Sequence, residues 1–329
     1  MRHTIRAHGP QSFSWFMKQA LYHPQHGYYS SGRAAIGRKG DYFTSVSVGP
    51  LFGQLMAAQF TQLWERMDRI DNFTIVEQGS HDGQFARDVL EALQERASEF
   101  FSAVRYRIVE PFPFWQDRQR QTLDSLLDKV EWHDSLESFT GAHFSNELLD
   151  AMPIDLRGKV VDLAGDDFIF VEHADQPNRQ PNQAALDWVD NVSRNLVRGY
   201  VLIIDYGFVS EESREIVQAR MQHRQLDSPF EQIGHADITA HVDWSSIAKR
   251  AKENGLSLAG FTDQHHFFTG IISERPELAA DVDPKSKRAL QTLLHPEMLG
   301  RRFQVLVLEK DVDPGARLAG FKFARSDDL

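Results

Sequence analysis

Short apolar runs that end in an acidic residue alternate with helical patterns between residues 73 and 147. The first run, FTIVE, ends at Glu77, and the second, over residues 104–109, is followed by Glu110. An amphipathic stretch with the 3.6-residue period of a helix lies between them. Strands that alternate with helices indicate a parallel sheet with right-handed crossover connections. The pattern therefore predicts an α/β fold built on a doubly wound sheet.

Further apolar runs complete a predicted sheet of seven strands. The run that ends at Asp205 is the most apolar in the chain. Ligands of such sheets bind beyond the carboxyl ends of the strands, so the residues that follow each run are candidate site residues. The additional strands are predicted at residues 129–132, 143–145, 200–204, 256–261 and 303–308.

Two segments depart from this alternation. Residues 1–70 show helical patterns around a long loop rich in glycine and serine, which predicts a helical N-terminal extension. Residues 154–183 contain two strand-like runs around an Ala-Gly-Asp turn, which predicts an inserted β-hairpin. We therefore divide the chain into the extension at 1–70 and a main α/β domain at 71–329 that carries the hairpin.

Composition excludes several classes of protein. The 329 residues include no cysteine, which excludes disulfides, thiolate zinc sites and a cysteine nucleophile. A net charge of −11 argues against nucleic acid as a partner, because such binding requires a cationic surface. No apolar run approaches the ~18 residues that span a membrane. The N-terminus lacks the apolar core of a signal peptide, so we expect a cytoplasmic protein.

The turn after the first predicted strand has features of a nucleotide site. It runs from Gly79 to Gly83 and opens a helix, where the backbone can approach a ligand. Glu110, after the second strand, can accept two hydrogen bonds from a ribose diol. The turn lacks the Gly-x-Gly-x-x-Gly pattern of dinucleotide sites, and Glu110 lies farther along the chain than their acidic residue. A nicotinamide oxidoreductase is therefore a distant alternative.

Nine segments, in order along residues 12–309, together resemble one family. They are LYHP with GYY (21–29), GDYFTS (40–45), LFG (51–53), VEQG through Asp88 (76–88), IVEP through Gln121 (108–121), NELLDAMP (146–153), DYG (205–207), DITAHVD (237–243) and RFQVL (302–306). The chain resembles the MidA family of class I S-adenosylmethionine (SAM) methyltransferases. The resemblance implies the seven-stranded, Rossmann-like methyltransferase sheet, with SAM as cofactor. The mitochondrial members resemble protein arginine methyltransferases that act in assembly of respiratory complex I.

The resemblance implies a SAM site made from residues after the first four strands and from the N-terminal loop. That loop would close over the cofactor as a lid; the plain alternative is an ordinary surface loop. Glu77 and Gly79 would flank the methionine moiety, Glu110 would hold the ribose and Asp134 would recognise the adenine amine. The alternatives are a solvated acid at Glu110 and a loop acid at Asp134. The complete predicted set is Asp41, Thr44, Glu77, Gly79, His81, Gly83, Glu110, Asp134 and Asn146.

One departure from the family lies in the glycine turn. Ser80 and His81 stand where the family usually has proline and its middle glycine. His81 then requires a positive φ, which is uncommon but permitted for histidine. Its ring could hydrogen-bond the ligand or weaken its binding.

Two acids that follow the fourth strand are candidate catalytic residues. Glu147 and Asp150 are three apart, a spacing that on a helical turn puts both on one side. A carboxylate can hold a guanidinium by two hydrogen bonds and later accept its proton. Asp150 could instead cap the segment before Pro153. His241 is a third candidate that could face the substrate channel, although a buried, hydrogen-bonded histidine is the plainer interpretation.

These residues predict a SAM-dependent methyltransferase that modifies an arginine on a partner protein. One alternative is a non-catalytic SAM-binding or assembly protein, in which His81 marks lost activity. Another is a small-molecule methyltransferase of the same fold. We expect no metal, since neither His23 with His26 nor His265 with His266 has a convincing ligand set. The identity of the partner and the oligomeric state, a homodimer included, stay open.

Overall fold

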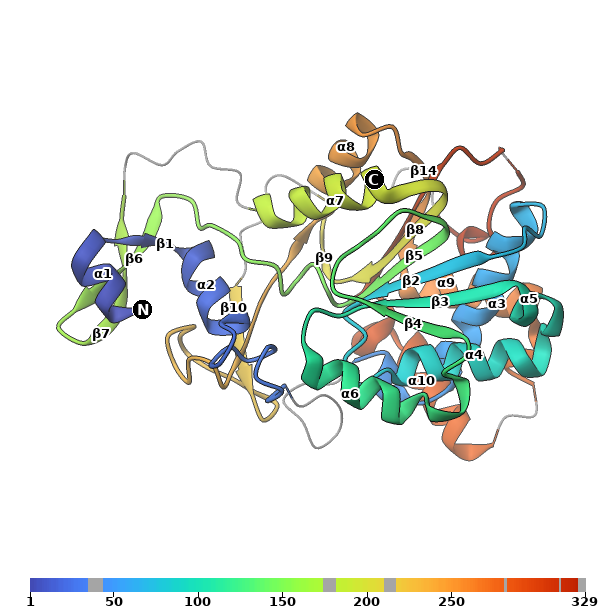
Figure 1. Ribbon diagram of the computed structural model, residues 1–329, viewed down its shortest axis with the longest axis horizontal. Coiled ribbons are helices and arrows are strands. Elements are labelled where there is room, and N and C mark those ends of the chain that lie inside the picture. The colour runs from blue at the N-terminus through green and yellow to red at the C-terminus, as the bar shows by residue number, and fades with distance from the viewer. Residues whose placement is uncertain (35–43, 174–181, 210–216, 281–282, 314, 325–329) are drawn as a thin grey trace. The chain divides into compact units, whose positions relative to one another are not determined.

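The chain folds into two compact units, each assembled from separated segments of sequence. The first unit comprises residues 1–43, 149–188 and 210–243, and the second comprises 44–148, 189–209 and 244–329. Figure 1 shows the computed structural model. The structure describes residues 1–34, 44–173, 182–209, 217–280, 283–313 and 315–324.

The second unit contains the predicted sheet. Among the described residues it has seven strands in the order β14-β15-β8-β5-β2-β3-β4. The five strands from β8 to β4 are parallel, whereas β15 is antiparallel to both β8 and β14. The predicted seven strands are confirmed, and the sheet is mixed because its last strand returns by a reversed connection. The strands are β2 (Phe73–Gln78), β3 (Val104–Val109), β4 (Val130–His133), β5 (Phe139–Asn146), β8 (Leu196–Asp205), β14 (Ser257–Asp263) and β15 (Gln304–Lys310).

Helices cover both faces of this sheet. The connections from β2 to β3 and from β5 to β8 step in opposite directions, so right-handed crossovers place their helices on opposite faces. Figure 1 shows α7 and α8 on one side and α3, α4, α9 and α10 on the other. The helices are α3 (Leu51–Arg66), α4 (Gln84–Arg96), α5 (Ser98–Ala103), α6 (Pro113–Thr122), α7 (Gln183–Asn195), α8 (Trp244–Glu253), α9 (Gln264–Glu274) and α10 (Pro284–Leu294); a short strand, β9 (Gly207–Phe208), follows β8.

The helix after β2 shows how the sequence produces these layers. Its apolar residues recur at helical spacing, and Phe85, Val89 and Leu93 are all buried. At ~25 cal/mol per Å² of apolar surface, each such side chain contributes about 1.5–3 kcal/mol when fully buried. Packing of this face fixes α4, and with it the turn that precedes α4.

The first unit surrounds an aromatic core. Phe16 lies 5.0 Å from Phe230 and 5.5 Å from Phe168 between ring centroids, and Phe13 lies 5.5 Å from Phe170. Its elements are α1 (Arg2–His8), β1 (Gln11–Ser12), α2 (Phe13–Tyr22), β6 (Lys159–Ala164), β7 (Asp167–Glu172), β10 (Val217–Met221), β11 (Arg224–Gln225), β12 (Asp237–Ala240) and β13 (Val242–Asp243).

The predicted hairpin is confirmed, and a second sheet is an addition to the prediction. β6 pairs antiparallel with β7 up to Ala164 opposite Asp167, and Gly165 in the turn has φ 66°. The second sheet has the order β11-β10-β12. The strands of this sheet are short, and they are interrupted by polar residues such as Arg220. They therefore form no apolar run that periodicity could detect.

The compact units do not follow the boundary expected at residue 70. Helix α3 lies in the second unit and packs closely on α4, since a Cβ on Gly53 would lie 2.5 Å from Cβ of Asp88. The hairpin instead belongs with α1 and α2 in the first unit. Periodicity shows that a helix has a buried face but not which element covers that face. Among the described residues, no helix is long and apolar enough to cross a membrane.

Candidate active site

The glycine turn joins β2 to α4 with three residues in the left-handed region. Gly79, His81 and Gly83 have φ values of 81°, 48° and 81°. The positive φ expected of His81 is therefore confirmed. A Cβ on Gly79 would also lie 3.3 Å from Cδ1 of Leu148, so both conformation and space favour glycine there.

Glu77, near the end of β2, is buried between strands. Its exposed fraction is 3%, and the Tyr106 hydroxyl on β3 donates to its Oε2 at 2.7 Å. Burial raises the pKa of Glu77 to about 8, although the Tyr106 hydrogen bond acts in the opposite direction. The carboxyl is therefore mostly protonated at neutral pH. Its expected place beside the methionine moiety stays a prediction.

Glu110 follows β3 and is a buried, oriented carboxylate. It is 7% exposed, so it is not the solvated acid of the alternative interpretation. Its Oε1 accepts from the Phe112 backbone N–H at 3.0 Å, and its Oε2 accepts from Nε2 of Gln119 at 3.3 Å. Burial raises the pKa of Glu110 to about 7, against both hydrogen bonds and the charge of His81.

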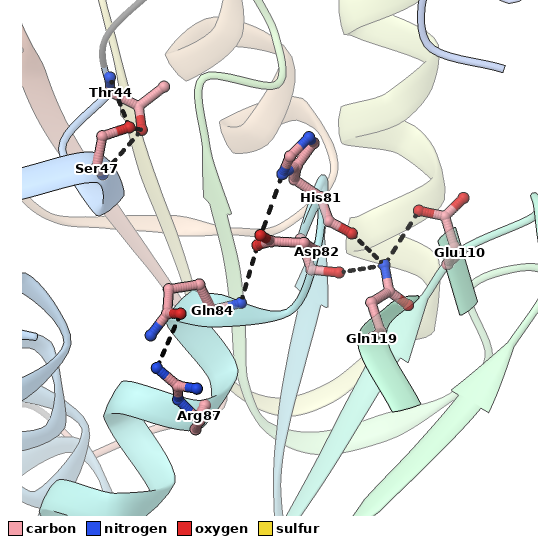
Figure 2. A network of polar contacts seen from close by, with 9 residues as sticks. Thr44, Ser47, His81, Asp82, Gln84, Arg87, Glu110 and Gln119 are labelled. Carbon is pink, nitrogen blue, oxygen red and sulfur yellow. Dashed lines mark hydrogen bonds and ion pairs between the residues drawn. The ribbon is translucent and has the colours of Figure 1, made fainter. Parts of the chain in front are cut away.

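Gln119 is a residue that the sequence analysis did not single out. Its side chain lies between the glycine turn and Glu110 (Figure 2), and its Nε2 donates to the His81 carbonyl at 2.8 Å and to Ser80 Oγ at 2.9 Å. The rings of His81 and Trp115 also meet, with centroids 4.3 Å apart. Trp115 and Gln119 are four residues apart on α6, and that spacing could have indicated a shared face.

Asp134 and Thr44 occupy different environments. Asp134 is exposed, and its Oδ1 accepts from Gln116 Nε2 at 3.1 Å; the same amide donates to the Glu110 carbonyl at 2.8 Å. Thr44 is buried, and its Oγ1 accepts from the Ser47 backbone N–H at 3.2 Å. Both ligand roles stay predictions, and Asp41 lies outside the described residues.

The end of β5 combines an unusual backbone with an unsatisfied polar atom. Glu147 has φ 53° and donates its backbone N–H to the Ile204 carbonyl at 2.9 Å. Nδ2 of Asn146 donates to Oε1 of Glu147 at 3.0 Å. Oδ1 of Asn146 is buried and has no hydrogen-bond partner among the described residues. Strained residues and orphaned acceptors of this kind concentrate at functional sites.

Comparison with known proteins identifies the family of this chain. Residues 55–162 and 168–262 match a family of S-adenosyl-L-methionine-dependent methyltransferases. The chain belongs to this family. It is similar over its whole length to a member of the COG1565 superfamily from Burkholderia thailandensis, solved with S-adenosyl-homocysteine bound. That match has 29% identity, a TM-score of 0.87, and coverage of 100% of this chain and 95% of the other.

Two curated relatives of the methyltransferase carry a more specific name. The Drosophila melanogaster "Protein arginine methyltransferase NDUFAF7 homolog, mitochondrial" is 27% identical over 94% of this chain and 83% of its own. The Homo sapiens "Protein arginine methyltransferase NDUFAF7, mitochondrial" is 23% identical over 99% and 85%. Together with the family match, these relatives bear out the predicted similarity to MidA-type methyltransferases.

The residues of this methyltransferase fit SAM on structural grounds. The turn from Gly79 to Gly83 runs at the end of β2 with backbone angles that glycine permits, and Glu110 offers an oriented acceptor for ribose hydroxyls. The unsatisfied Oδ1 of Asn146 adds an acceptor after β5. When bound, SAM supplies an electrophilic methyl group on a sulfonium. Within the described ranges, no three His, Asp or Glu gather as a metal-ligand set.

Two of the three predicted catalytic residues lie in the first unit of the methyltransferase. Residues 147–152 form bends and a turn, so the helical spacing assumed for Glu147 and Asp150 is wrong. The chain leaves β5 in a left-handed conformation that a helical turn cannot contain.

Asp150 is buried, and its carbonyl accepts from the Ala240 backbone N–H at 2.8 Å. Burial, followed by the charge of Arg220, lowers the pKa of the half-buried His241. The catalytic roles of Asp150 and His241 stay predictions.

Proposed function

We propose that this SAM-dependent methyltransferase modifies an arginine side chain of a partner protein. The observation that carries the proposal is the Glu147 carboxylate, which follows β5 with φ 53° and accepts from Asn146. The names of the Drosophila and human relatives support arginine as the acceptor, at 27% and 23% identity.

A carboxylate at this position suits the chemistry of arginine. A guanidinium is cationic and a poor nucleophile, so it must be held with one nitrogen directed at the methyl group. Glu147 can accept two of its N–H groups, localise positive charge away from the attacking nitrogen, and take up the released proton. Positioning of the nitrogen for in-line attack then supplies most of the acceleration.

The test is to identify the methylated residue. The purified protein is incubated with methyl-tritiated SAM and an extract of cells that lack this chain, and the labelled proteins are hydrolysed to amino acids. We expect label in methylarginine, and no label when Glu147→Gln replaces the parent protein. Label in another amino acid or in a small molecule contradicts arginine as the acceptor.

One observation favours the alternative of a non-catalytic SAM-binding protein. His81 occupies the turn with φ 48°, where a glycine would carry no steric cost. Its ring packs on Trp115, so the substitution is accommodated by its surroundings. Tight binding of SAM without label in any acceptor would favour this alternative.

A further inference from the structure

The side chain of Gln119 is completely buried on α6 and has hydrogen-bonding neighbours on three sides. Nε2 lies 2.8 Å from the His81 carbonyl oxygen, 2.9 Å from Ser80 Oγ and 3.3 Å from Glu110 Oε2. Oε1 accepts from Nε1 of Trp132 at 3.0 Å. One amide therefore contacts the glycine turn after β2, the acid after β3 and the strand β4.

Trp132 fixes the orientation of this amide. An indole N–H only donates, so the oxygen of Gln119 must face Trp132 and its NH₂ group must face Glu110 and the turn. The NH₂ group has two hydrogens for three acceptors. The contact with Glu110 is the longest of the three, which leaves Oε2 with capacity for a further donor such as a ribose hydroxyl.

The backbone of α6 is also pressed against the turn. A Cβ on Gly83 would lie 3.3 Å from Cα of Gln119, which is tighter than ordinary van der Waals contact. A side chain at position 83 would therefore crowd helix α6, and the Gln119 amide bonds the turn at this close approach. Gln119 therefore bridges the turn and Glu110 directly.

We propose that Gln119 is a positioning residue of the SAM site, which holds the glycine turn and the Glu110 carboxylate in register and thereby sets SAM affinity. It acts through Ser80, His81 and Glu110. The inference concerns cofactor binding, so it does not depend on arginine being the acceptor.

The pH dependence of binding separates positioning from a merely structural role. The Gln119 hydrogen bond and the charge of His81 lower the pKa of Glu110, in opposition to burial. The Glu110 carboxyl faces the Phe112 backbone N–H on its own segment, Gln119 on α6 and His81 in the turn. The ionised carboxylate is the better acceptor for ribose, so affinity should rise with pH through the pKa of Glu110. Loss of the Gln119 bond should move that rise to higher pH.

The experiment is calorimetric titration with S-adenosylhomocysteine between pH 5.5 and 9. Gln119→Met keeps the volume of the side chain and removes its hydrogen bonds. Gln121→Met, at an exposed position on the same helix, is the matched control. We expect Gln119→Met to weaken binding about tenfold at pH 7 and to shift the pH midpoint upward, and the control to match the parent protein.

Parent affinity in Gln119→Met overturns the proposal, and so does weakened binding with an unchanged pH midpoint. Trp132→Phe provides a second test if Gln119→Met does not fold, because it removes the donor that orients the amide and keeps an aromatic ring on β4. We expect Trp132→Phe to bind more weakly, with its midpoint shifted in the same direction. Parent affinity and midpoint in Trp132→Phe would then count against the proposal.

Discussion

Two parts of the same sheet edge are built in contrasting ways. After β2 and β3, the polar groups are enclosed and paired: Tyr106 bonds Glu77, and Gln119 bonds both Glu110 and the glycine turn. After β5, Glu147 adopts a left-handed backbone, and Oδ1 of Asn146 is buried without a partner among the described residues. The first part is held in place by its own hydrogen bonds, whereas the second contains a buried acceptor that no described residue satisfies.

The contrast fits the different tasks of the two parts. A cofactor that binds in one orientation favours a rigid site, since preorganised groups lose little entropy on binding. The acceptor must be oriented only while the methyl group moves. Binding energy from strained or unsatisfied groups is then best realised in the transition state. We therefore expect substitutions of Glu110 to change affinity and substitutions of Glu147 to change rate.

The largest effect is expected from Glu147→Gln. The neutral amide can neither balance the guanidinium charge nor accept its proton, so methyl transfer should fall about 10²–10⁴-fold. Binding of S-adenosylhomocysteine should stay unchanged. Single-turnover assays and calorimetry measure the two quantities separately. A fully active variant would remove Glu147 from catalysis, and a large loss of affinity would erase the contrast between the two parts.

Glu77→Gln tests the enclosed part through its stability. Burial raises the pKa of Glu77 to about 8 in the folded protein, from 4.5 in an unfolded chain. The folded state therefore binds more protons between these values, and stability falls as pH rises through this window. Glutamine carries no charge and can still accept from Tyr106, so the variant should be more stable at pH 9 by about 5 kcal/mol.

Urea unfolding at pH 4.5 and pH 9 measures this difference. The exposed Glu95→Gln on α4 is the control and should follow the parent protein at both values. An equal loss of stability with pH in Glu77→Gln and in the parent protein would contradict the inference that Glu77 is held protonated.

Glu110→Ala should weaken S-adenosylhomocysteine about 10- to 100-fold, because the ribose loses a charged acceptor. Calorimetry at pH 8, where most of the carboxylate is ionised, gives the largest difference. Glu137→Ala, at an exposed position, is the control. Unchanged affinity in Glu110→Ala would place the ribose elsewhere.

The part of the edge after β2 and β3 was more predictable from sequence than the part after β5. Glu77 ends the apolar run of β2, Gly79 follows that strand and Glu110 follows β3, and strand ends of a parallel sheet share one edge. Gln119 was missed because a buried glutamine in a polar helix looks like any solvated one. Its role depends on tertiary neighbours that periodicity does not encode.

After β5 the prediction of a helical turn was wrong because of one backbone angle. The interval from Glu147 to Asp150 fits a helix in sequence, but φ 53° at Glu147 ends regular structure at that residue. The two-unit arrangement was also beyond the pattern, because residues 149–188 and 210–243 join the N-terminal segment through tertiary contacts such as the pairing of β1 with β6, which sequence periodicity does not encode.

The smallest effect is expected at His81, where opposing contributions nearly cancel. His81→Gly relieves about 1–2 kcal/mol of left-handed strain. It also loses a ring contact with Trp115 of about 0.5–1.5 kcal/mol and adds the backbone entropy of glycine to the unfolded chain. Stability should therefore change by less than about 1 kcal/mol. His81→Ala keeps the strain and loses the contact, so it should unfold more easily than His81→Gly.

Ligand affinity decides between the two roles considered for this ring. The charge of protonated His81 lowers the pKa of Glu110, so removal of the ring should reduce affinity for S-adenosylhomocysteine modestly, within about threefold, where His81 is protonated. The loss should vanish above pH 8.5, where Glu110 is ionised with or without His81. Tighter binding by His81→Gly at every pH would instead show that the ring obstructs the ligand. His81 would then lower cofactor affinity, although its neighbours after β2 and β3 favour binding.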